Sequence, residues 1–283
     1  LTSGWNKSVM NADDYRAYVG GTSGLIYGYV NDGFYKVEDF EYFDSKSRTW
    51  KLKEGVVDSS PLSDTPRPGN AKFKKLTPVD PNSSNPYQLT EADRTVIGNT
   101  TPKFSGGFGL NATYKGFDLS MFFNFMYDFD VFNANKVMLT TWADNHENNF
   151  GMEVASDKRW RNFDDMGNEI RYSPELLAEF NKNATMWNPT SIGKPISMSY
   201  AVEDGSFLRL NSATLGYTLP QEWTKKAGLN KVRFYVAGSN LFTITGYSGY
   251  DPEVDIATGL TPNIDNNRYP RSRTYTFGAQ LTF

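Results

Sequence analysis

Apolar and polar residues alternate with a period of two along several segments in the second half of the chain. From Phe104 to Lys115, one side of an extended strand would carry Phe104, Gly106, Phe108, Leu110, Ala112 and Tyr114. After a turn at Lys115-Gly116, the alternation resumes, with Ser120, Asn124 and Asp128 opposite Phe117, Leu119, Met121, Phe123 and Phe125. Such alternation is typical of β-strands with one apolar face. A tilted strand needs about 9–11 residues to cross a bilayer, so these segments are long enough to do so.

Three further segments follow the same pattern. Residues 207–219 end with one face formed by Ala213, Leu215, Tyr217 and Leu219. Residues 232–242 place Arg233, Tyr235 and Ser239 opposite Val232, Phe234 and Val236, although Ala237 and Leu241 interrupt the pattern. The last segment alternates polar residues with Tyr275, Phe277, Ala279, Leu281 and Phe283. The sequence therefore predicts an all-β fold whose strands cover residues 103–115, 116–129, 206–219, 231–243 and 272–283.

The connections between these strands alternate between short and long. Outer-membrane barrels join their strands by short periplasmic turns and long extracellular loops. On this pattern residues 130–205 and 244–271 are extracellular loops, Lys103 lies at the extracellular rim and the C-terminus is periplasmic. Residues 1–102 lack the alternation, and we interpret them as a mainly extracellular loop region that precedes the barrel strands.

Local signals predict a few elements outside the long strands. Ser173 followed by Pro174 and Glu175 predicts the start of a short helix that runs to Phe180. Residues 220–228 resemble a helical turn that ends at Gly228. Asn31-Asp32-Gly33 predicts a hairpin within residues 24–35, and the many Pro, Ser, Asp and Asn residues of segment 61–86 predict a loop.

Five strands are too few to close a membrane barrel, because bacterial barrels have at least about eight. An open edge in lipid would leave backbone groups without hydrogen bonds. We therefore expect this chain to be one piece of a larger protein. Its start at Leu1, with no signal peptide ahead of it, fits a processed or truncated product.

The composition agrees with a membrane barrel and excludes several other classes. Aromatic residues make up 15% of the chain, although its mean hydropathy is −0.55. Barrels combine aromatic girdles with polar lumens and loops, which explains both values. The net charge of −3 gives no basic field for nucleic acid. The absence of cysteine excludes disulfides and thiol chemistry, and no run of 18 apolar residues is present to form a transmembrane helix.

Candidate catalytic chemistry is sparse, and we expect no enzyme, no cofactor and no metal site. His146, the one histidine, reads as a solvated loop residue, because a metal site needs several convergent ligands. Asp251, Glu253 and Asp255 alternate along an extended loop, where calcium is one possible ligand and a brace to Arg268 or Arg271 is the favoured alternative. Six loop aromatics either stack on sugar rings or pack the loops and a partner surface: Trp142, Trp160, Trp187, Tyr200, Tyr247 and Tyr250.

An ordered series of motifs resembles the C-terminal part of SusC-like TonB-dependent outer-membrane transporters, the SusC/RagA family. The series covers nearly the whole chain from Gly28 onward: Gly28–Phe34, Pro68–Phe73, Asp93–Asn99, Tyr114–Ser120, Leu208–Leu210, Leu215–Pro220, Ala237–Phe242, Tyr250–Val254 and the strand that ends at Phe283. Many relatives carry an Asp-rich stretch before the Asp-Arg-Thr motif. Here that place reads Val79–Tyr87, so no cation-binding role carries over to it.

The resemblance implies a 22-stranded antiparallel barrel with a plug, most of which lies upstream of this chain. It further implies an outer-membrane importer of glycans or peptides in a Bacteroidetes-like Gram-negative bacterium. Its partners would be a SusD-like surface lipoprotein and the TonB complex, the latter reached through upstream regions. The alternatives are a soluble all-β carbohydrate-binding module, whose strands would be shorter and more regularly spaced, and an outer-membrane barrel without a plug.

The final strand carries the one set of site residues that we assign from the sequence. By the family resemblance, the assembly machinery reads a barrel's last strand, and here that strand presents Tyr275, Phe277, Leu281 and Phe283. The alternative is that Phe283 is only one more lipid-facing ring of the periplasmic girdle. The sequence does not identify substrate-binding residues.

Overall fold

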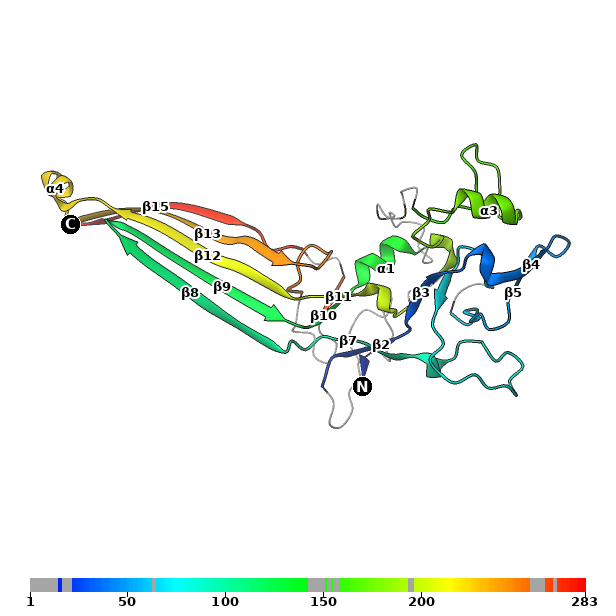
Figure 1. Ribbon diagram of the computed structural model, residues 1–283. Helices are drawn as coiled ribbons and strands as arrows, with labels where there is room; N and C mark the ends of the chain where they lie inside the picture. Colours follow the sequence, from blue (N-terminus) through cyan, green and yellow to red (C-terminus); the bar gives the residue numbers. More distant parts are fainter. Residues whose placement is uncertain are drawn as a thin grey trace. The chain divides into compact units, whose positions relative to one another are not determined.

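The computed structural model describes residues 15–16, 22–62, 65–141, 151, 154, 158–192, 196–254, 263–266 and 269–283 (Figure 1). The chain divides into two compact units. The first, which we call the loop unit, takes its described residues from Leu1–Thr100, Phe132–Val202 and Asp255–Asn266. The second, the strand unit, takes them from Thr101–Val131, Glu203–Val254 and Asn267–Phe283.

The strand unit is built on one antiparallel five-stranded sheet with the order β15-β13-β12-β9-β8 (Figure 1). Its strands are β8 (Phe104–Tyr114), β9 (Phe117–Tyr127), β12 (Phe207–Thr218), β13 (Lys231–Thr245) and β15 (Thr274–Thr282). Four of them lie inside the predicted segments, and β13 continues two residues beyond its predicted end. The all-β character expected from the alternation is therefore confirmed.

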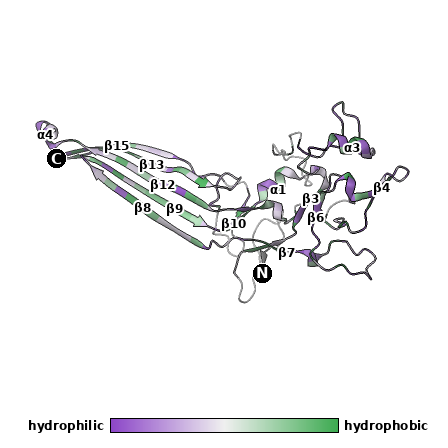
Figure 2. Cartoon of the chain, in the orientation of Figure 1, coloured by the Kyte–Doolittle hydropathy of each residue, from purple (hydrophilic) through white to green (hydrophobic). Residues whose placement is uncertain are grey.

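The register places the apolar residues of all five strands on one face. In an antiparallel ladder, residues directly opposite each other project to the same side. Phe108 pairs with Phe123, Leu119 with Leu215, and Val236 with both Leu215 and Phe277. Figure 2 shows the result as green positions that alternate with paler and purple ones along the strands. The face is thus continuous from β8 to β15.

A bulge explains why the alternation in β13 is irregular. The register between β12 and β13 shifts between Leu210 and Ser212, which pair with Phe242 and Ser239. Asn240 lies in this shift with φ of 52°. The extra residue returns Leu241 to the neighbourhood of Gly238, where a Cβ would lie 2.6 Å from a Leu241 methyl carbon. A bulge of this kind changes which positions share a face, so simple alternation fails there.

Short turns at one end of the sheet follow the predicted chemistry. Lys115 and Gly116 join β8 to β9 with φ values of 45° and 87°. Two successive positive φ angles are the signature of a type I′ hairpin turn, for which glycine is favoured. Between β12 and β13 the chain forms α4 (Gln221–Thr224) and the 3-10 turn η6 (Lys225–Ala227), which end at Gly228 with φ of 71°. Both predictions are confirmed.

The loop unit consists of short strands and helical turns from distant parts of the chain. Its strands are β1 (Tyr15–Arg16), β2 (Leu25–Gly28), β3 (Asn31–Phe34), β4 (Phe40–Asp44), β5 (Thr49–Leu52), β6 (Ala71–Phe73), β7 (Thr95–Asn99) and β14 (Ile264–Asp265). Its helices are α1 (Ala134–Thr140) and α3 (Pro174–Phe180), with 3-10 turns η2 (Val37–Asp39), η3 (Glu91–Asp93), η4 (Pro189–Ser191) and η5 (Ser199–Ala201). Two strands lie where the units meet along the chain, β10 (Asp130–Asn133) and β11 (Val202–Asp204).

The predicted hairpin at Asn31-Asp32-Gly33 is wrong. These residues lie inside β3, which pairs with β6, whereas β2 pairs with β1 and β7. The Asn31 side chain accepts a hydrogen bond from Gly33 N at 3.1 Å, so the turn-like motif forms a local irregularity of the strand instead. The partner strand Ala71–Phe73 also interrupts the segment 61–86 that we predicted as loop.

The helix predicted after Ser173 is confirmed. Ser173 is the N-cap of α3, and its hydroxyl accepts a hydrogen bond from Leu176 N, while Pro174 occupies the first helical position. Leu177 is the residue of this helix that is buried. Within the described ranges, no helix is long and apolar enough to span a bilayer.

Three hydrophobic clusters are present, and each of them lies within one unit. The largest belongs to the loop unit and joins segments far apart in sequence, among them Ile26, Phe73, Phe132 and Met198. A second loop-unit cluster is formed by Trp160, Ile170 and Leu177. The strand unit has a small cluster at the loop ends of its strands, formed by Phe129, Val131, Phe207, Tyr247 and Val254. The sheet itself has no such cluster among the described residues.

Candidate functional site

The apolar face of the five-stranded sheet is exposed over its whole width. Large side chains at which at least two-fifths of the surface is accessible include Phe108, Leu110, Tyr114, Phe117, Leu215, Phe234, Val236 and Phe242. The residues predicted as an end-strand signal belong to this face. Tyr275, Phe277 and Leu281 lie on β15, and Phe283 follows it directly. Phe277 is 77% exposed and Phe283 is 83% exposed, so all four are presented outward.

The sheet has two edges. Among the described residues, β15 pairs with β13 alone and β8 pairs with β9 alone. The outer edge of each strand therefore carries backbone groups that no described residue of the sheet satisfies. Such groups cost several kcal/mol each in a hydrocarbon environment, of the order expected for an unpaired amide. In a hydrocarbon environment, the sheet would therefore need a further strand at each edge.

The opposite face of the sheet is polar and carries an ion pair. Asp118 on β9 accepts a hydrogen bond from Arg233 Nε at 2.9 Å and also contacts Arg233 Nη2. Gly216 on β12 makes room for this arginine, because a Cβ there would lie 2.4 Å from Nη2. In the same way Gly278 on β15 accepts the ring of Tyr235, which a Cβ would approach to 2.4 Å. Glycines thus allow large polar side chains to lie flat on this face.

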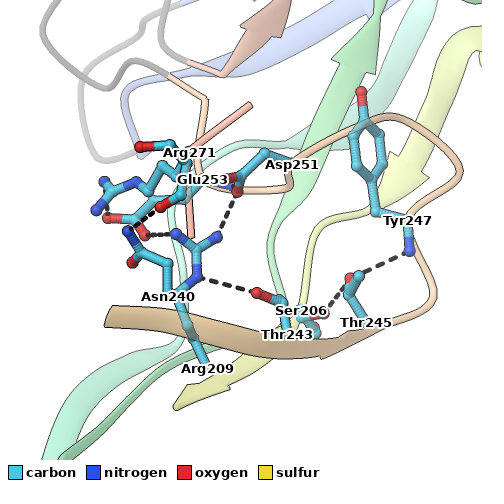
Figure 3. A network of polar contacts seen from close by, with 10 residues as sticks. Ser206, Arg209, Asn240, Thr243, Thr245, Tyr247, Asp251, Glu253 and Arg271 are labelled. Carbon is cyan, nitrogen blue, oxygen red and sulfur yellow. Dashed lines mark hydrogen bonds and ion pairs between the residues drawn. The ribbon is translucent and has the colours of Figure 1, made fainter. Parts of the chain in front are cut away.

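A buried arginine organises the ends of strands β12 and β13 (Figure 3). Arg209 projects from β12, its side chain is 2% exposed, and its Nε donates to Thr243 Oγ1 at 3.1 Å. Its two other nitrogens contact carboxylates of the following loop, Nη2 with Asp251 and Nη1 with Glu253 Oε2 at 3.2 Å. Glu253 also pairs with Arg271 Nη2 at 2.7 Å.

This network is a neutral brace between strands and loop. It contains two guanidinium groups and two carboxylates, so its charges balance. The predicted pairing of the Asp251–Glu253 segment with Arg271 is confirmed, whereas Asp255 and Arg268 lie outside the described residues. Sequence reasoning missed Arg209 as the central partner. The available signal was a lone arginine near the start of a strand, at a position that faces away from Leu208 and Leu210.

Neighbouring hydroxyl groups hold the loop that carries these carboxylates. Thr245 Oγ1 donates to Ser206 O at 2.8 Å and accepts from Tyr247 N at 3.1 Å (Figure 3). Asp251 Oδ1 also accepts from Glu253 N at 2.9 Å. Asp251 is therefore occupied by the arginine and by its own backbone turn. Over the part of the chain that the structure describes, no three His, Cys, Asp or Glu side chains gather in the manner of a metal site.

Most of the predicted loop aromatics pack inside the protein. Trp160, Trp187 and Tyr247 are buried, which contradicts direct stacking on a ligand and agrees with the alternative that they pack the loops. Tyr200 lies against Trp187 with ring centroids 4.6 Å apart, and Lys136 Nζ lies 4.3 Å from its centroid. Tyr250 differs, since it is 81% exposed. Trp142 and His146 lie outside the described residues.

The Asp-Arg-Thr motif has a structural role in the loop unit. Asp93 is fully buried and accepts hydrogen bonds from three backbone amides, Leu76, Thr77 and Thr90, at 2.8–2.9 Å. The Thr77 and Thr90 hydroxyls donate to it at 2.7 and 3.0 Å, and Lys75 Nζ lies 3.3 Å away. Burial raises the pKa of this carboxyl, but the bonds from Thr77 and Thr90 outweigh it and hold the pKa well below its usual range. Asp93 therefore ties two loops to β7.

Arg94, the next residue of the motif, lies over aromatic rings. Its guanidinium carbon is 5.0 Å from the Tyr27 ring centroid and 5.9 Å from that of Tyr29, and Nη2 donates to Tyr27 O at 2.9 Å. The cation–π geometry and the hydrogen bond join β2 to the turn before β7. The motif thus fastens the strands of the loop unit, and no catalytic arrangement surrounds it in the described residues.

Known proteins share both the sequence and the fold of this chain. TonB-dependent receptor P3 of Formosa agariphila is 32% identical over 266 residues, which cover 92% of this chain and 22% of the receptor. TonB-dependent receptor P26 of the same organism is 28% identical over 250 residues, 83% of this chain and 22% of the receptor. TonB-dependent receptor SusC of Bacteroides thetaiotaomicron is 37% identical over 86 residues, 30% of this chain and 8% of SusC. No protein-family model matches.

Solved structures show the same fold. The RagAB peptide transporter superposes with a TM-score of 0.60 at 22% identity and covers 93% of this chain and 23% of the other. The 'open-open' state of the RagAB peptide importer gives a TM-score of 0.58 at 21% identity and covers the whole chain and 25% of the other. The chain spans about a fifth of the length of the Formosa receptors. Sequence and fold together place it among the SusC-like TonB-dependent receptors, of which it forms a part.

Proposed function

We propose that this chain forms part of the barrel wall of an outer-membrane active importer. The observation that carries the proposal is the exposed apolar face that runs without interruption across five antiparallel strands. These strands have 9–15 residues, and about 9–11 residues suffice for a tilted strand to cross the hydrocarbon core. In water such a face would be an aggregation surface, whereas in lipid it is the expected outer wall.

The polar face then lines the lumen. Asp118 and Arg233 are paired there, and the edges at β8 and β15 join the remaining strands of the same protein. A lumen of this kind needs no catalytic residue, because transport draws its energy from the TonB complex through upstream regions. We propose no enzymatic activity and no cofactor. The cargo class that we propose is glycans or oligosaccharides, with peptides as the alternative that the RagAB likeness favours.

The proposed topology puts the long loops outside the cell and the C-terminus in the periplasm. Residues 130–205 and 244–271 would be extracellular loops that contact a SusD-like surface lipoprotein, which closes over the barrel. Residues 1–102 would be mainly extracellular. The parity of long and short connections supports this orientation. The short connection with α4 and η6 would then be periplasmic.

Spin labels in the full-length protein, reconstituted in lipid, test the barrel assignment. Leu119 and Ser120 are adjacent on β9 and project to opposite faces. A label at Leu119 should be relaxed by oxygen dissolved in the bilayer, and a label at Ser120 by a water-soluble nickel chelate. The reverse result, or water exposure of both labels in a protein that needs no detergent, would support the soluble carbohydrate-binding alternative instead.

Labelling on intact cells tests the orientation. Met166 in the loop unit and Trp223 in α4 are both exposed, so each accepts a cysteine with little disturbance. In an otherwise cysteine-free full-length protein, a membrane-impermeant maleimide should modify Met166→Cys from outside. Trp223→Cys should react only after the outer membrane has been permeabilised. Reaction of Trp223→Cys on intact cells would invert the topology.

A further part of the proposal concerns assembly. We propose that Tyr275, Phe277, Leu281 and Phe283 together form the signal by which the barrel-assembly machinery engages the last strand. Their outward position on an edge strand leaves both side chains and backbone accessible before the barrel closes.

A further inference from the structure

Two pockets of the loop unit are lined by five arginines. The larger, with a volume of ≈ 520 Å³, lies between the segment after Trp160 and the turn at Asn188–Thr190, and includes Arg159, Arg161 and Arg171. The smaller, of ≈ 170 Å³, includes Arg48, Arg67 and Arg171. Asn162 and Arg171 line both pockets. The two volumes are therefore neighbours around one arginine.

Local hydrogen bonds hold the walls of these pockets in place. Buried Asn181, at the end of α3, accepts from Arg161 N at 2.6 Å and donates to Arg161 O at 2.9 Å. Trp160 N donates to Met186 O at 2.8 Å, and Ile170 N donates to Asn162 O at 2.9 Å. Since the backbone on both sides of the larger pocket is fixed, the arginine side chains start from defined positions.

The carboxylates near these arginines neutralise only part of the positive charge. Asp164 accepts from Met166 N, Asn168 N and Asn168 Nδ2 at 2.8–2.9 Å, and the bond from the Asn168 side chain, first among these, lowers the pKa of Asp164. The Asp164 carboxylate is therefore occupied by hydrogen bonds within its own turn. Asp165 pairs with Arg161 at 2.7 Å, and Glu169 pairs with Arg171.

Two arginines have no such partner. Neither Arg48 nor Arg159 lies within ion-pair distance of a carboxylate of the described residues. Among the described residues that line the smaller pocket, none is Asp or Glu. Arg48 is exposed and Arg159 is half-buried, so a ligand can approach both side chains. Unpaired guanidinium groups around a concave surface attract anions.

Aromatic rings lie beside the arginines. The Tyr172 ring centroid is 4.8 Å from the guanidinium carbon of Arg48 and 5.8 Å from that of Arg171. The Phe163 ring centroid is 5.7 Å from the guanidinium carbon of Arg171, and the residue is 46% exposed. Trp160 also lines the larger pocket, and its buried Nε1 has no hydrogen-bond partner among the described residues. The Tyr172 ring thus has two guanidinium groups near it, of which Arg171 alone has a carboxylate partner, Glu169, among the described residues.

We propose that the two arginine-lined pockets bind an acidic oligosaccharide, one whose sugar units carry carboxylates. The planar guanidinium fork matches a carboxylate in two parallel hydrogen bonds. Arg159 and Arg171 would bind one such group in the larger pocket, and Arg48 a second in the smaller. The exposed ring of Phe163 offers a face to a pyranose ring, while Asn162, Asn188 and Thr190 provide amide and hydroxyl groups for sugar hydroxyls.

This inference rests on the proposed import function and names its cargo class. It places cargo capture in the loop unit, in the half of the protein that the proposal puts outside the cell. An acidic peptide would use the same arginines but would not need the aromatic ring and the amide groups.

Binding to the full-length protein in detergent tests the inference. The probes are trigalacturonic acid and its fully methyl-esterified form, which keeps the sugar rings and removes the charges. Titration calorimetry at low salt should show binding of the acid and at least tenfold weaker binding of the ester, because charge-assisted hydrogen bonds are lost. Raising the salt concentration should weaken binding of the acid more than that of the ester.

Variants locate the site. The double variant Arg48→Gln with Arg159→Gln removes the two charges that have no carboxylate partner among the described residues, and it should lower affinity for the acid about tenfold or more. Lys182→Gln is the matched control, an exposed cation in the turn after α3 that lines neither pocket, and it should change affinity less than twofold. If the double variant does not fold, the acid and ester pair still decides the matter on the unmodified protein.

Three results would overturn the inference. These are equal affinity for acid and ester, an undiminished affinity in the double variant, and tighter binding of triglutamate than of trigalacturonate, which would assign the pockets to acidic peptides. The import proposal would survive each of them, because its own test is the lipid contact of Leu119. Conversely, if the protein is soluble and binds the acid at these arginines, the inferred binding site stands and the import proposal fails.

Discussion

The two units bury their large side chains in opposite ways. In the loop unit, Phe73 and Met198 are fully buried, and they meet through segments more than a hundred residues apart. In the strand unit, Phe277 and Leu281 are exposed on a face that no described residue covers. The loop unit therefore has a core of its own, as soluble domains have. We expect the sheet of the strand unit to derive its stability from its hydrogen-bonded strands and from an apolar environment against its exposed face.

A matched pair of phenylalanine substitutions gives the largest effect and tests the difference directly. Phe73→Ala removes a fully buried ring and should destabilise the loop unit by about 3–5 kcal/mol. Phe277→Ala removes a ring that is mostly exposed in the chain, so it should leave the stability of the loop unit unchanged. Urea unfolding of the full-length protein in detergent, followed through the protease sensitivity of the loops, measures the stability of the loop unit in each variant.

The comparison depends on which variant changes which unit. Equal losses from Phe73→Ala and Phe277→Ala would mean that the two units unfold as one, with burial shared between them. A larger loss from Phe277→Ala would show that its ring is packed against protein, in the remaining strands or plug, and not against lipid.

The next largest effect is expected at Arg209. Arg209→Met leaves Asp251 without a cationic partner in a mostly buried position, and removal of one member of a buried ion pair costs about 3–5 kcal/mol. We expect the loop after β13 to become sensitive to proteolysis while the sheet remains intact. Arg273→Met, an exposed arginine just before β15, is the control and should have no such effect.

A further variant separates the cost of the unpaired charge from the cost of lost packing. A variant that replaces Arg209 and Asp251 together by apolar residues of similar size should recover part of the stability, because Glu253 keeps its pair with Arg271 and no unpaired charge remains. If the double variant is as unstable as Arg209→Met, the network contributes through its geometry and not through charge balance.

These two regions also differ in how well the sequence predicts them. The strands of the sheet were predictable, because a strand with one apolar face imposes a period of two on the residues themselves. Lys115-Gly116 gave the turn and Ser173 gave the start of α3 for similar local reasons. The irregular β13 was not predictable in detail. Its bulge at Asn240 depends on the partner strand, and the alternation shows only that something interrupts it.

The loop unit was largely beyond sequence reasoning. Asn31-Asp32-Gly33 carried a strong hairpin signal, yet the backbone pairs with Ala71–Phe73, about forty residues away. The role of Asp93 depends on a partner in a separate loop, Thr77, and no local pattern records this contact. The same holds in the strand unit for Arg209, whose partner Asp251 lies 42 residues further along the chain. The buried state of Trp160 and Trp187 had the same origin, since burial is set by tertiary contacts.

A smaller effect, with a pH dependence, is expected at Asp93. Its pKa is depressed in the folded state, so its contribution to stability is complete above the pKa of an unfolded aspartate, about 4. The contribution is lost as the pH falls below that value toward the folded pKa. Asp93→Asn replaces one acceptor oxygen by a donor among several N–H and O–H groups, and should cost about 1–3 kcal/mol at pH 7.

The difference between the two proteins should shrink as the pH falls below about 4, where the unmodified carboxyl starts to be protonated in the unfolded state. Urea midpoints between pH 3 and pH 7 measure this. Glu179→Gln, an exposed carboxylate on α3, should show no comparable pH-dependent difference. A constant difference at all pH values would mean that Asp93 acts by shape alone.

The smallest effect on folding stability is expected at Phe283, and this is what makes it informative. Its ring is 83% exposed in the chain, so its loss removes at most a few kcal/mol of burial in lipid, which a large barrel should tolerate. If Phe283 belongs to the assembly signal, Phe283→Ala in the full-length protein should nevertheless sharply lower the amount in the outer membrane, with the remainder degraded in the periplasm. Phe234→Ala, an exposed ring on the same face of an inner strand, is the matched control and should assemble normally.

Surface labelling measures the amount of each variant in the outer membrane, and the heat stability of the purified protein measures how stably it is folded. Normal surface levels with slightly reduced heat stability would reduce Phe283 to a lipid-facing girdle residue, because a lost recognition signal and a lost lipid contact act at different stages: the first before insertion and the second after it.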